Sequence, residues 1–249
     1  QCVLIVRDLL LDRITLAKSL SNMPINSFPF PSLIYHYNGQ LVQDAFVDHL
    51  LDMDGGFFVD VGAGVDGFKQ QRRVINCASN TYYFEKNRGW NGIAIDYDRD
   101  YIDYAKESRK CCCVCVDLLD ININEVLEKN NCPDVVDYLS FDVDDAQKKV
   151  LNDLDLKKYS FKIITFEHNI YLETDEALNL HKLSRQKFLS SGYDLLLKDV
   201  VLKGYGPMED WYINSDLVKD LPPLHLDLWE GGVTDFWPTL IMGKAVNDT

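Results

Sequence analysis

A short apolar strand followed by a glycine-rich loop constrains the fold of this chain more than any other feature. Apart from Asp60, the run from Phe57 to Val61 is apolar, aromatic and β-branched, as is typical of a buried parallel strand. The strand is expected to end at Gly62, where Gly62, Gly64 and Gly67 form the pattern G-x-G-x-x-G. Missing β-carbons let the backbone turn sharply there and let a ligand lie against it. The pattern therefore predicts a site for a nucleotide-like ligand.

Two acids narrow the choice of ligand. A second strand, predicted from Gly92 to Ile95, ends in Asp96, and an acid at that tip can accept both hydroxyls of a ribose. In a dinucleotide-binding fold this acid follows the glycines by about 20 residues, whereas Asp96 lies considerably farther past Gly67. Asp60 would repel a pyrophosphate and attract an ammonium or sulfonium group. These residues favour S-adenosylmethionine, which carries positive charge and no phosphate.

Three segments match a known set of motifs in order: GGFFVDVGAGVDG, SNTYYFEKNRGWNGIAID and DYLSFDVDDAQKKVLNDLDLKKYSFKIITFEHN, with a weaker QDAFV upstream. They resemble the FkbM-type methyltransferases of the class I S-adenosylmethionine-dependent fold, and the likeness runs from Gln43 to Asn169. The chain departs from this family at three places. The family usually has Asn-Asp-Gly at 64–66, Glu where Asp96 stands and Gly where Asp145 stands.

The resemblance implies which residues hold the cofactor. Asp60 and the glycine loop would hold the methionine part, and Asp96 the ribose. Asp117 would accept a hydrogen bond from the adenine amino group, with the following leucine beside the ring. From the residues alone, Ser79 or Asn80 would instead cap the next helix, and Asp117 would cap a helix or start a turn. The full set expected at the cofactor is Asp60, Gly62, Ala63, Gly64, Asn80, Asp96, Tyr97, Asp117, Leu118 and Asp142.

Acids and a histidine follow the next two predicted strands. Asp142, Asp144 and Asp145 lie at the end of one strand, and Glu167 and His168 lie at the end of the next. Parallel sheets place ligands at the carboxyl ends of their strands, so we expect the transferring methyl group here. His168 has the pKa range to take a proton from a substrate hydroxyl, and the acids other than Asp145 are the alternative catalytic residues. Two other readings stay open: the acids cap a helix, or they bind a divalent cation.

Strands alternate with helices along the chain, which predicts a mostly parallel sheet with helices on both faces. The resemblance adds a Rossmann-like class I methyltransferase fold with an antiparallel closing strand, preceded by the segment Asp210 to Tyr212. We expect an N-terminal helical segment over 1–40 and one methyltransferase domain over 41–249. The predicted strands are 57–61, 92–95, 111–116, 135–143, 161–167 and 193–203, and the predicted helices are 3–20, 43–53, 82–88, 100–109, 124–129, 146–154 and 176–190.

Charge and composition exclude several classes of protein. The formal net charge of −14 makes binding to a nucleic-acid backbone unfavourable. The basic cluster Lys69 to Arg73 predicts either a solvated face or a contact with an anionic substrate. Hydrophobic residues make up 47% of the chain, but no apolar run is long enough for a membrane span. The apolar beginning contains charges that a signal peptide would lack.

Four of the seven cysteines lie between Cys111 and Cys115. Their spacing suits neither a zinc site, which needs separated C-x-x-C pairs, nor a framework of spaced disulfides. We expect small apolar side chains with free thiols in a third strand of a reduced, cytoplasmic protein.

The sequence therefore predicts methyl transfer from S-adenosylmethionine, most simply to a hydroxyl of a sugar, another small molecule or a glycan. Two rival functions remain. An NAD-dependent oxidoreductase is favoured by the literal G-x-G-x-x-G. A non-catalytic module that keeps the fold is favoured by the departures at Val65 and Asp145, since both lie at the expected working edge of the sheet.

Overall fold

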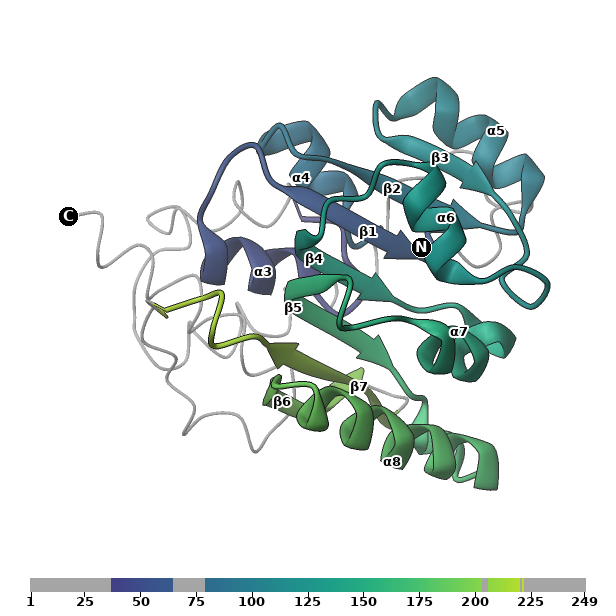
Figure 1. The fold of residues 1–249 in the computed structure, drawn as a ribbon, viewed down its shortest axis with the longest axis vertical. Coiled ribbons are helices and arrows are strands. Elements are labelled where there is room, and N and C mark those ends of the chain that lie inside the picture. The colour runs from purple at the N-terminus through teal and green to yellow at the C-terminus, as the bar shows by residue number, and fades with distance from the viewer. Residues whose placement is uncertain (1–36, 65–78, 203–205, 220, 222–249) are drawn as a thin grey trace, which may run out of the picture.

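The computed structural model describes residues 37–64, 79–202, 206–219 and 221 of this 249-residue chain (Figure 1). Three predicted features lie outside the described residues: the N-terminal helix at 3–20, Gly67 with the basic cluster that follows it, and the C-terminal tail from residue 222.

A seven-stranded sheet with the order β3-β2-β1-β4-β5-β7-β6 forms the centre of the protein. The strands β1 to β5 are parallel, and β7 is antiparallel to both of its neighbours, β5 and β6. The strands are β1 (Phe57–Val61), β2 (Asn91–Asp96), β3 (Cys112–Cys115), β4 (Val135–Phe141), β5 (Ser160–Glu167), β6 (Asp194–Leu202) and β7 (Gly206–Ile213). This arrangement confirms the predicted Rossmann-like sheet with its antiparallel closing strand.

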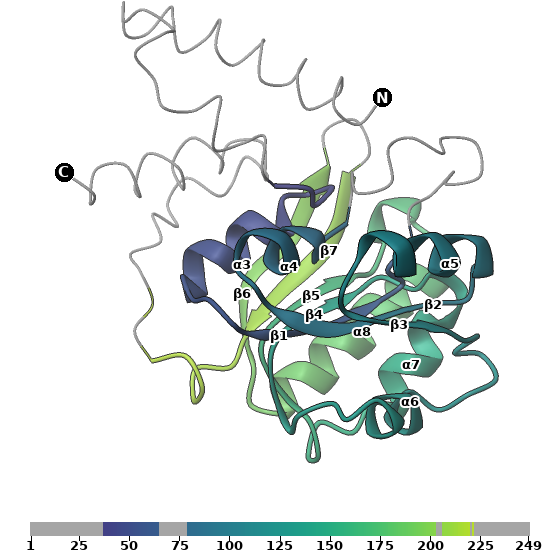
Figure 2. The ribbon, with the colours of Figure 1, turned by 90° about the horizontal axis from the view of Figure 1, so that it is seen from above.

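Helices cover both faces of the sheet, which confirms the second part of that prediction. Helices α3, α4 and α5 lie on one face, and α6, α7 and α8 lie on the other (Figure 2). The helices are α3 (Gln43–Leu51), α4 (Tyr82–Asn87), α5 (Arg99–Ser108), α6 (Ile123–Lys129), α7 (Gln147–Asp153) and α8 (Asp175–Ser190). None of the described helices combines the length and the apolar character needed to cross a bilayer.

Because both faces are covered, the central strands are apolar along most of their length, and successive side chains enter two different cores. In β1, Phe58 packs in the core under α3 to α5, whereas Val59 packs in the core over α6 to α8. Ile163 and Ile164 of β5 divide in the same way. We call the side of the sheet that carries α3 to α5 the site face.

One expectation about the end of the chain was wrong. The segment Asp210 to Tyr212 was predicted to precede the closing strand, but it lies inside β7. Asp210 pairs with Phe166, and Tyr212 pairs with Ile164. The strand begins earlier because its backbone completes the open edge of β5.

The strand order reverses between β1 and β4, which is where a crevice opens in sheets of this kind. Gly62 ends β1 there with φ +83°, and a β-carbon at this position would lie 1.5 Å from the backbone oxygen of Asp142. The amide of Asp142 in turn donates to the carbonyl of Val61 at 2.9 Å. Only glycine lets the ends of β1 and β4 approach this closely.

Candidate active site

The turn after β1 is held against the end of β2 by backbone hydrogen bonds. The amides of Gly62 and Ala63 both donate to the carbonyl of Ile95 at 3.0 Å. The amide of Gly64 donates to Oδ2 of Asp96 at 2.7 Å. The described part of the glycine loop and the predicted ribose acid therefore form one continuous wall.

Asp96 keeps unused acceptor capacity in this wall. Its Oδ1 accepts a hydrogen bond from the amide of Asp98 at 2.7 Å, so two of the about four acceptor positions of the carboxylate are filled. Burial raises the pKa of Asp96, and the hydrogen bonds from Asp98 and Gly64 oppose that shift. The neighbouring Tyr97 is 71% exposed, so its ring offers a flat surface beside the carboxylate.

Asp60 is placed on the site face, as predicted, but it is not a free carboxylate. It is 2% exposed and accepts a 2.6 Å hydrogen bond from Oγ1 of Thr81. Nη1 of the buried Arg109 lies 4.0 Å from its Oδ2. Burial raises the pKa of Asp60, while the charge of Arg109 and the hydrogen bond from Thr81 lower it. Asp60 was expected to attract a cationic ligand through its negative charge, and the nearby Arg109 compensates part of that charge.

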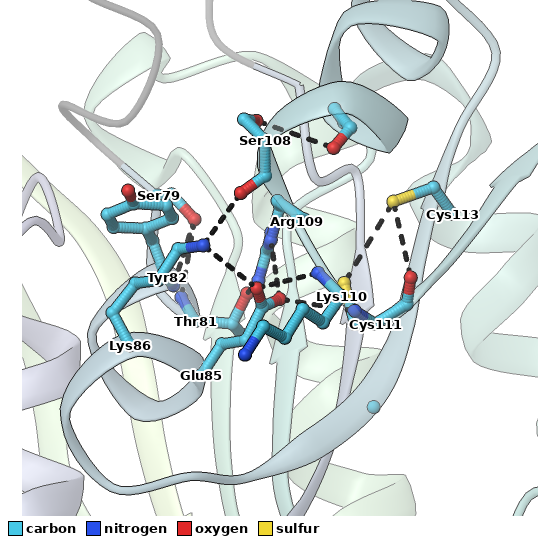
Figure 3. Close-up of polar contacts among 12 residues, drawn as sticks. Ser79, Thr81, Tyr82, Glu85, Lys86, Ser108, Arg109, Lys110, Cys111 and Cys113 are labelled. Carbon is cyan, nitrogen blue, oxygen red and sulfur yellow. Dashed lines mark hydrogen bonds and ion pairs between the residues drawn. The ribbon is translucent and has the colours of Figure 1, made fainter.

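Arg109 is held by a second acid and is a residue that the sequence argument missed. Its Nε donates to Glu85 Oε2 at 3.2 Å, and its Nη2 donates to Thr81 Oγ1 at 2.9 Å (Figure 3). A basic residue at the end of a predicted amphipathic helix gave no sign of burial in the sequence. The burial results from the packing of α5 against the sheet beside α4.

Asn80 reaches across to β4. Its Nδ2 donates to Ser140 Oγ at 3.0 Å, and its Oδ1 is buried with no hydrogen-bond partner among the described residues. The capping role falls to Ser79, whose Oγ accepts from the amide of Tyr82 at 3.2 Å. Buried oxygens are nearly always satisfied in folded proteins, so Asn80 Oδ1 marks a place where a ligand donor fits.

Asp142, Asp144 and Glu167 come together at the carboxyl ends of β4 and β5. One ligand oxygen from each lies within 4.8 Å of the others, so the group could hold a divalent cation through oxygen ligands. Burial raises the pKa of Asp142 well above its usual value, with further contributions from its hydrogen bond to Glu167 and from the charge of Glu167. Burial also raises the pKa of Glu167. The two side chains thus favour sharing a proton over carrying two full charges.

Glu209 extends this acidic cluster, and no local pattern in the sequence marked it. It stands opposite Glu167 in the antiparallel β5–β7 pair. Its carboxylate accepts hydrogen bonds from Gln43 Nε2 at 2.7 Å and from Trp211 Nε1. Burial raises its pKa to about 8, against the lowering effect of the hydrogen bond from Trp211. Gln43 is the first residue of α3 and of the QDAFV segment that forms the upstream part of the resemblance.

His168 lies on the other face of the sheet, which removes the geometric basis for its predicted catalytic role. It shares the alternation of Ile164 and Phe166, which pack in the core over α6 to α8. Its Nδ1 accepts from the amide of Ile170 at 3.2 Å, and its Nε2 points toward Asp210 Oδ1 at 3.6 Å. The error has a simple cause: adjacent residues of a strand point to opposite faces, so Glu167 and His168 cannot serve the same site.

The surroundings of His168 are an ion network rather than a metal site. His168, His181, Asp199 and Asp210 bring their ligand atoms within 4.8 Å of one another, but Arg185 already occupies the carboxylates. Its Nε donates to Asp210 Oδ2 at 2.7 Å, and its Nη2 donates to Asp199 Oδ1 at 2.8 Å. Burial alone would raise the pKa of Asp210, yet the hydrogen bond from Arg185 brings it below its usual range. In addition, a metal-bound histidine normally donates from its second ring nitrogen, whereas Nδ1 of His168 accepts.

The two residues predicted at the adenine differ in their surroundings. Asp117 is exposed, and its Oδ1 accepts from the amide of Leu119 at 2.8 Å, as in the turn that the residues alone predicted. Leu118 is 2% exposed and packs in the core over α6 to α8, so it offers no free surface to a ring. The half-exposed Leu119 presents its side chain at this edge instead.

Comparison with known proteins gives similarities of fold. A precorrin-6y C5,15-methyltransferase from Geobacter metallireducens GS-15 has 15% identity and a TM-score of 0.41, over 70% of this chain and 87% of that one. Fibrillarin from Aeropyrum pernix, crystallised with S-adenosyl-L-methionine, has 14% identity and a TM-score of 0.42, over 72% and 76%. A methyltransferase from Pyrococcus furiosus has 11% identity and a TM-score of 0.35, over 84% and 97%. No family model and no curated protein matches the chain.

Proposed function

We propose that this protein is an S-adenosylmethionine-dependent methyltransferase that methylates a hydroxyl group of a sugar, another small molecule or a glycan. The observation that carries the proposal is the meeting of Gly62, Gly64 and Asp96 at the point where the strand order reverses. There the missing β-carbons of the two glycines let the turn pack against Asp142 and Asp96, and the carboxylate of Asp96, which has spare acceptor positions, accepts from the amide of Gly64 at 2.7 Å. These are the groups that a nucleoside with free ribose hydroxyls needs.

The residues present fit this cofactor on three counts. Asp96 retains acceptors for the two ribose hydroxyls, and the exposed ring of Tyr97 can stack on the adenine. Asn80 Oδ1 offers a buried acceptor that an ammonium group can satisfy. Asp60, partly compensated by Arg109, contributes residual negative charge that favours a cation over a pyrophosphate. When bound, S-adenosylmethionine supplies a methyl group on a sulfonium, whose departure leaves a neutral thioether.

The protein's own part in the reaction is to align the acceptor, exclude water and remove one proton. Glu167 is the proposed general base for the acceptor hydroxyl. Its raised pKa brings it closer to neutral pH, where a base is most effective. Burial and the hydrogen bond to Glu167 raise the pKa of Asp142 well above its usual value, so Asp142 is the proposed proton donor of the pair and Glu167 the proposed acceptor. Asp144 completes the cluster, either beside the substrate or as an oxygen ligand to a divalent cation.

Calorimetric titration with S-adenosylmethionine and with NAD tests the cofactor assignment. The wild-type protein should bind the first and not the second. Asp96→Asn should weaken binding about tenfold, since a hydrogen bond to the ribose is worth about 1–1.5 kcal/mol. The matched control is Asp98→Asn, because Asp98 caps α5 through its side-chain oxygen and asparagine preserves that cap. Binding of NAD alone would establish the oxidoreductase instead.

Transfer of a labelled methyl group to a panel of mono- and oligosaccharides tests the reaction. Glu167→Gln should lower turnover by about 10²–10⁴ and leave cofactor affinity within about twofold, because the change removes the base without altering the cofactor wall. Glu176→Gln, in the exposed first turn of α8 on the opposite face, is the control and should keep full turnover. Wild-type protein that binds cofactor and methylates no acceptor would favour the non-catalytic module.

A further inference from the structure

Two cysteine thiols lie side by side where the chain enters β3. Sγ of Cys111 and Sγ of Cys113 are 3.9 Å apart. The intervening Cys112 points to the other side, where its Sγ donates to Asn130 Oδ1 at 3.2 Å. Cys111 is buried and Cys113 is partly exposed. The pair therefore combines one thiol that solvent can reach with a second, protected thiol directly behind it.

The accessible thiol has the surroundings of a reactive cysteine. A hydrogen bond from Cys111 lowers the pKa of Cys113 to about 7, and the charge of Arg109 contributes in the same direction. The same pairing raises the pKa of Cys111, and burial adds to that shift. The described Cys132 provides a contrast, since burial raises its pKa to about 12. Thiolate character combined with partial exposure is what makes a cysteine sensitive to oxidation.

The pair of cysteines is connected through Glu85 to Arg109 and Thr81 (Figure 3). Glu85 Oε2 accepts from the backbone amide of Cys111 at 3.3 Å and from Nε of Arg109 at 3.2 Å. Arg109 donates onward to Thr81 Oγ1, and Thr81 donates to Asp60. Cys111 and Arg109 thus donate to the same oxygen of Glu85. A displacement of Cys111 therefore disturbs the position of Arg109, whose positive charge offsets the negative charge of Asp60.

We propose that Cys111 and Cys113 form a redox-modification site, at which a hydroperoxide joins the two thiols in a disulfide and thereby loosens the Arg109 contacts at the cofactor wall. A disulfide requires the sulfur atoms to approach to about 2 Å. Cys113 is fixed by its pairing with Ala94 in the sheet, whereas Cys111 precedes the strand. Cys111 therefore moves, and its amide leaves Glu85.

The Cys113 thiolate attacks one oxygen of the hydroperoxide, the O–O bond breaks, and the departing oxygen takes up a proton as water or an alcohol. The Cys113 sulfenic acid that results is attacked by the sulfur of Cys111. Cys111 gives up its proton, and the sulfenic oxygen leaves as water. Two thiols lose two electrons to become one disulfide, and the peroxide is reduced by the same two electrons.

The first measurement uses the reduced wild-type chain and needs no variant. At pH 7, a thiol-alkylating reagent should modify Cys113 at least about tenfold faster than Cys132 or Cys112. After treatment with hydrogen peroxide, peptide mass spectrometry should find a linkage between Cys111 and Cys113 that is lighter by two hydrogens. Equal alkylation rates, or a disulfide that includes Cys112 or Cys115, would overturn the proposal.

Serine variants separate the roles of the two thiols. Cys111→Ser should stop at the Cys113 sulfenic acid, which dimedone traps, and should form no disulfide. Cys113→Ser should give neither product at this site. Cys112→Ser is the matched control and should form the disulfide at the wild-type rate. Disulfide formation that survives in Cys111→Ser would refute the assignment of the second thiol.

The effect on the cofactor wall has its own readouts. Peroxide should lower the thermal midpoint of the wild-type protein and leave that of Cys111→Ser unchanged, whatever the protein's activity. Affinity for S-adenosylmethionine should fall at least about tenfold on oxidation, and this part rests on the proposed function. If the reduced protein binds no S-adenosylmethionine, the proposed function fails while the disulfide and the thermal shift stand. A disulfide without a thermal shift would refute the coupling to Arg109.

Discussion

Gly62 is the position where one added methyl group should do the most damage. In Gly62→Ala the new β-carbon would lie 1.5 Å from the backbone oxygen of Asp142 and 2.5 Å from its carbonyl carbon. Neither atom belongs to a side chain that can swing away. Relief of the overlap requires the ends of β1 and β4 to separate, which breaks the 2.9 Å hydrogen bond from Asp142 N to Val61 O.

Three costs add up in this variant. Alanine at φ +83° is disfavoured by about 1–2 kcal/mol, the lost backbone hydrogen bond costs about 1 kcal/mol, and forced separation of packed backbone costs about 1–3 kcal/mol. We expect a loss of about 3–6 kcal/mol, which is a large part of the total stability of an ordinary domain. Cofactor binding should fall with it, because the displaced end of β1 carries the glycine turn that contacts Asp96.

Gly192→Ala is the matched control. Gly192 has φ +87°, and a β-carbon there would meet nothing within 4 Å. This variant should lose only the conformational cost of about 1–2 kcal/mol. Urea unfolding followed by tryptophan fluorescence measures both free energies of unfolding, and calorimetry measures cofactor affinity. If the free energies of unfolding of the two variants differ by less than about 0.5 kcal/mol, the close approach of β1 and β4 is refuted.

Three further changes test other parts of the site and its surroundings. Gly64→Ala would place a β-carbon 2.4 Å from Oδ2 of Asp96, and this carboxylate can rotate away. Calorimetry should therefore show about tenfold weaker cofactor binding, while the free energy of unfolding in urea changes by less than about 1 kcal/mol. Unchanged affinity would exclude Asp96 from the site. Arg109→Met removes the cation beside Asp60 and Glu85, the second of which keeps its ion pair with Lys86. The change should cost about 3–5 kcal/mol at pH 7, and this deficit should shrink as the pH falls and the acids take up protons. A deficit independent of pH would contradict the ion pairing. The pKa of Asp210 is depressed in the folded protein by Arg185, against the effect of burial, so its contribution to stability is present above the ordinary value of 3.8 and disappears as the pH falls further. The free energies of unfolding of Asp210→Asn and the wild type, measured from pH 6 to pH 2, should therefore converge toward pH 2. A constant difference between the two proteins over this range would contradict the role of Asp210.

The helices and strands could largely be predicted from the order of the amino acids. The apolar run before Gly62 predicted β1, the alternation of strands and helices predicted the parallel sheet, and Asp96 was correctly expected at the end of β2. Ser79 or Asn80 was expected to cap α4; the N-cap residue is Thr81, and Ser79 Oγ accepts from the first helical amide, that of Tyr82. These features depend on neighbouring residues and on backbone sterics, so a single stretch of chain contains the information.

Which side chains meet depends instead on how the helices and strands pack together. Glu167 and His168 are consecutive, yet the pleat of β5 sends one to the acidic cluster and the other to Arg185 and its carboxylates. Glu209 reaches the cluster because β7 inserts beside β5, and Arg109 reaches Asp60 because α5, which Arg109 follows, packs over β2 and β3. A buried ion pair between residues far apart in the sequence leaves no pattern in either segment, since the two residues interact only after folding brings them together and removes them from water.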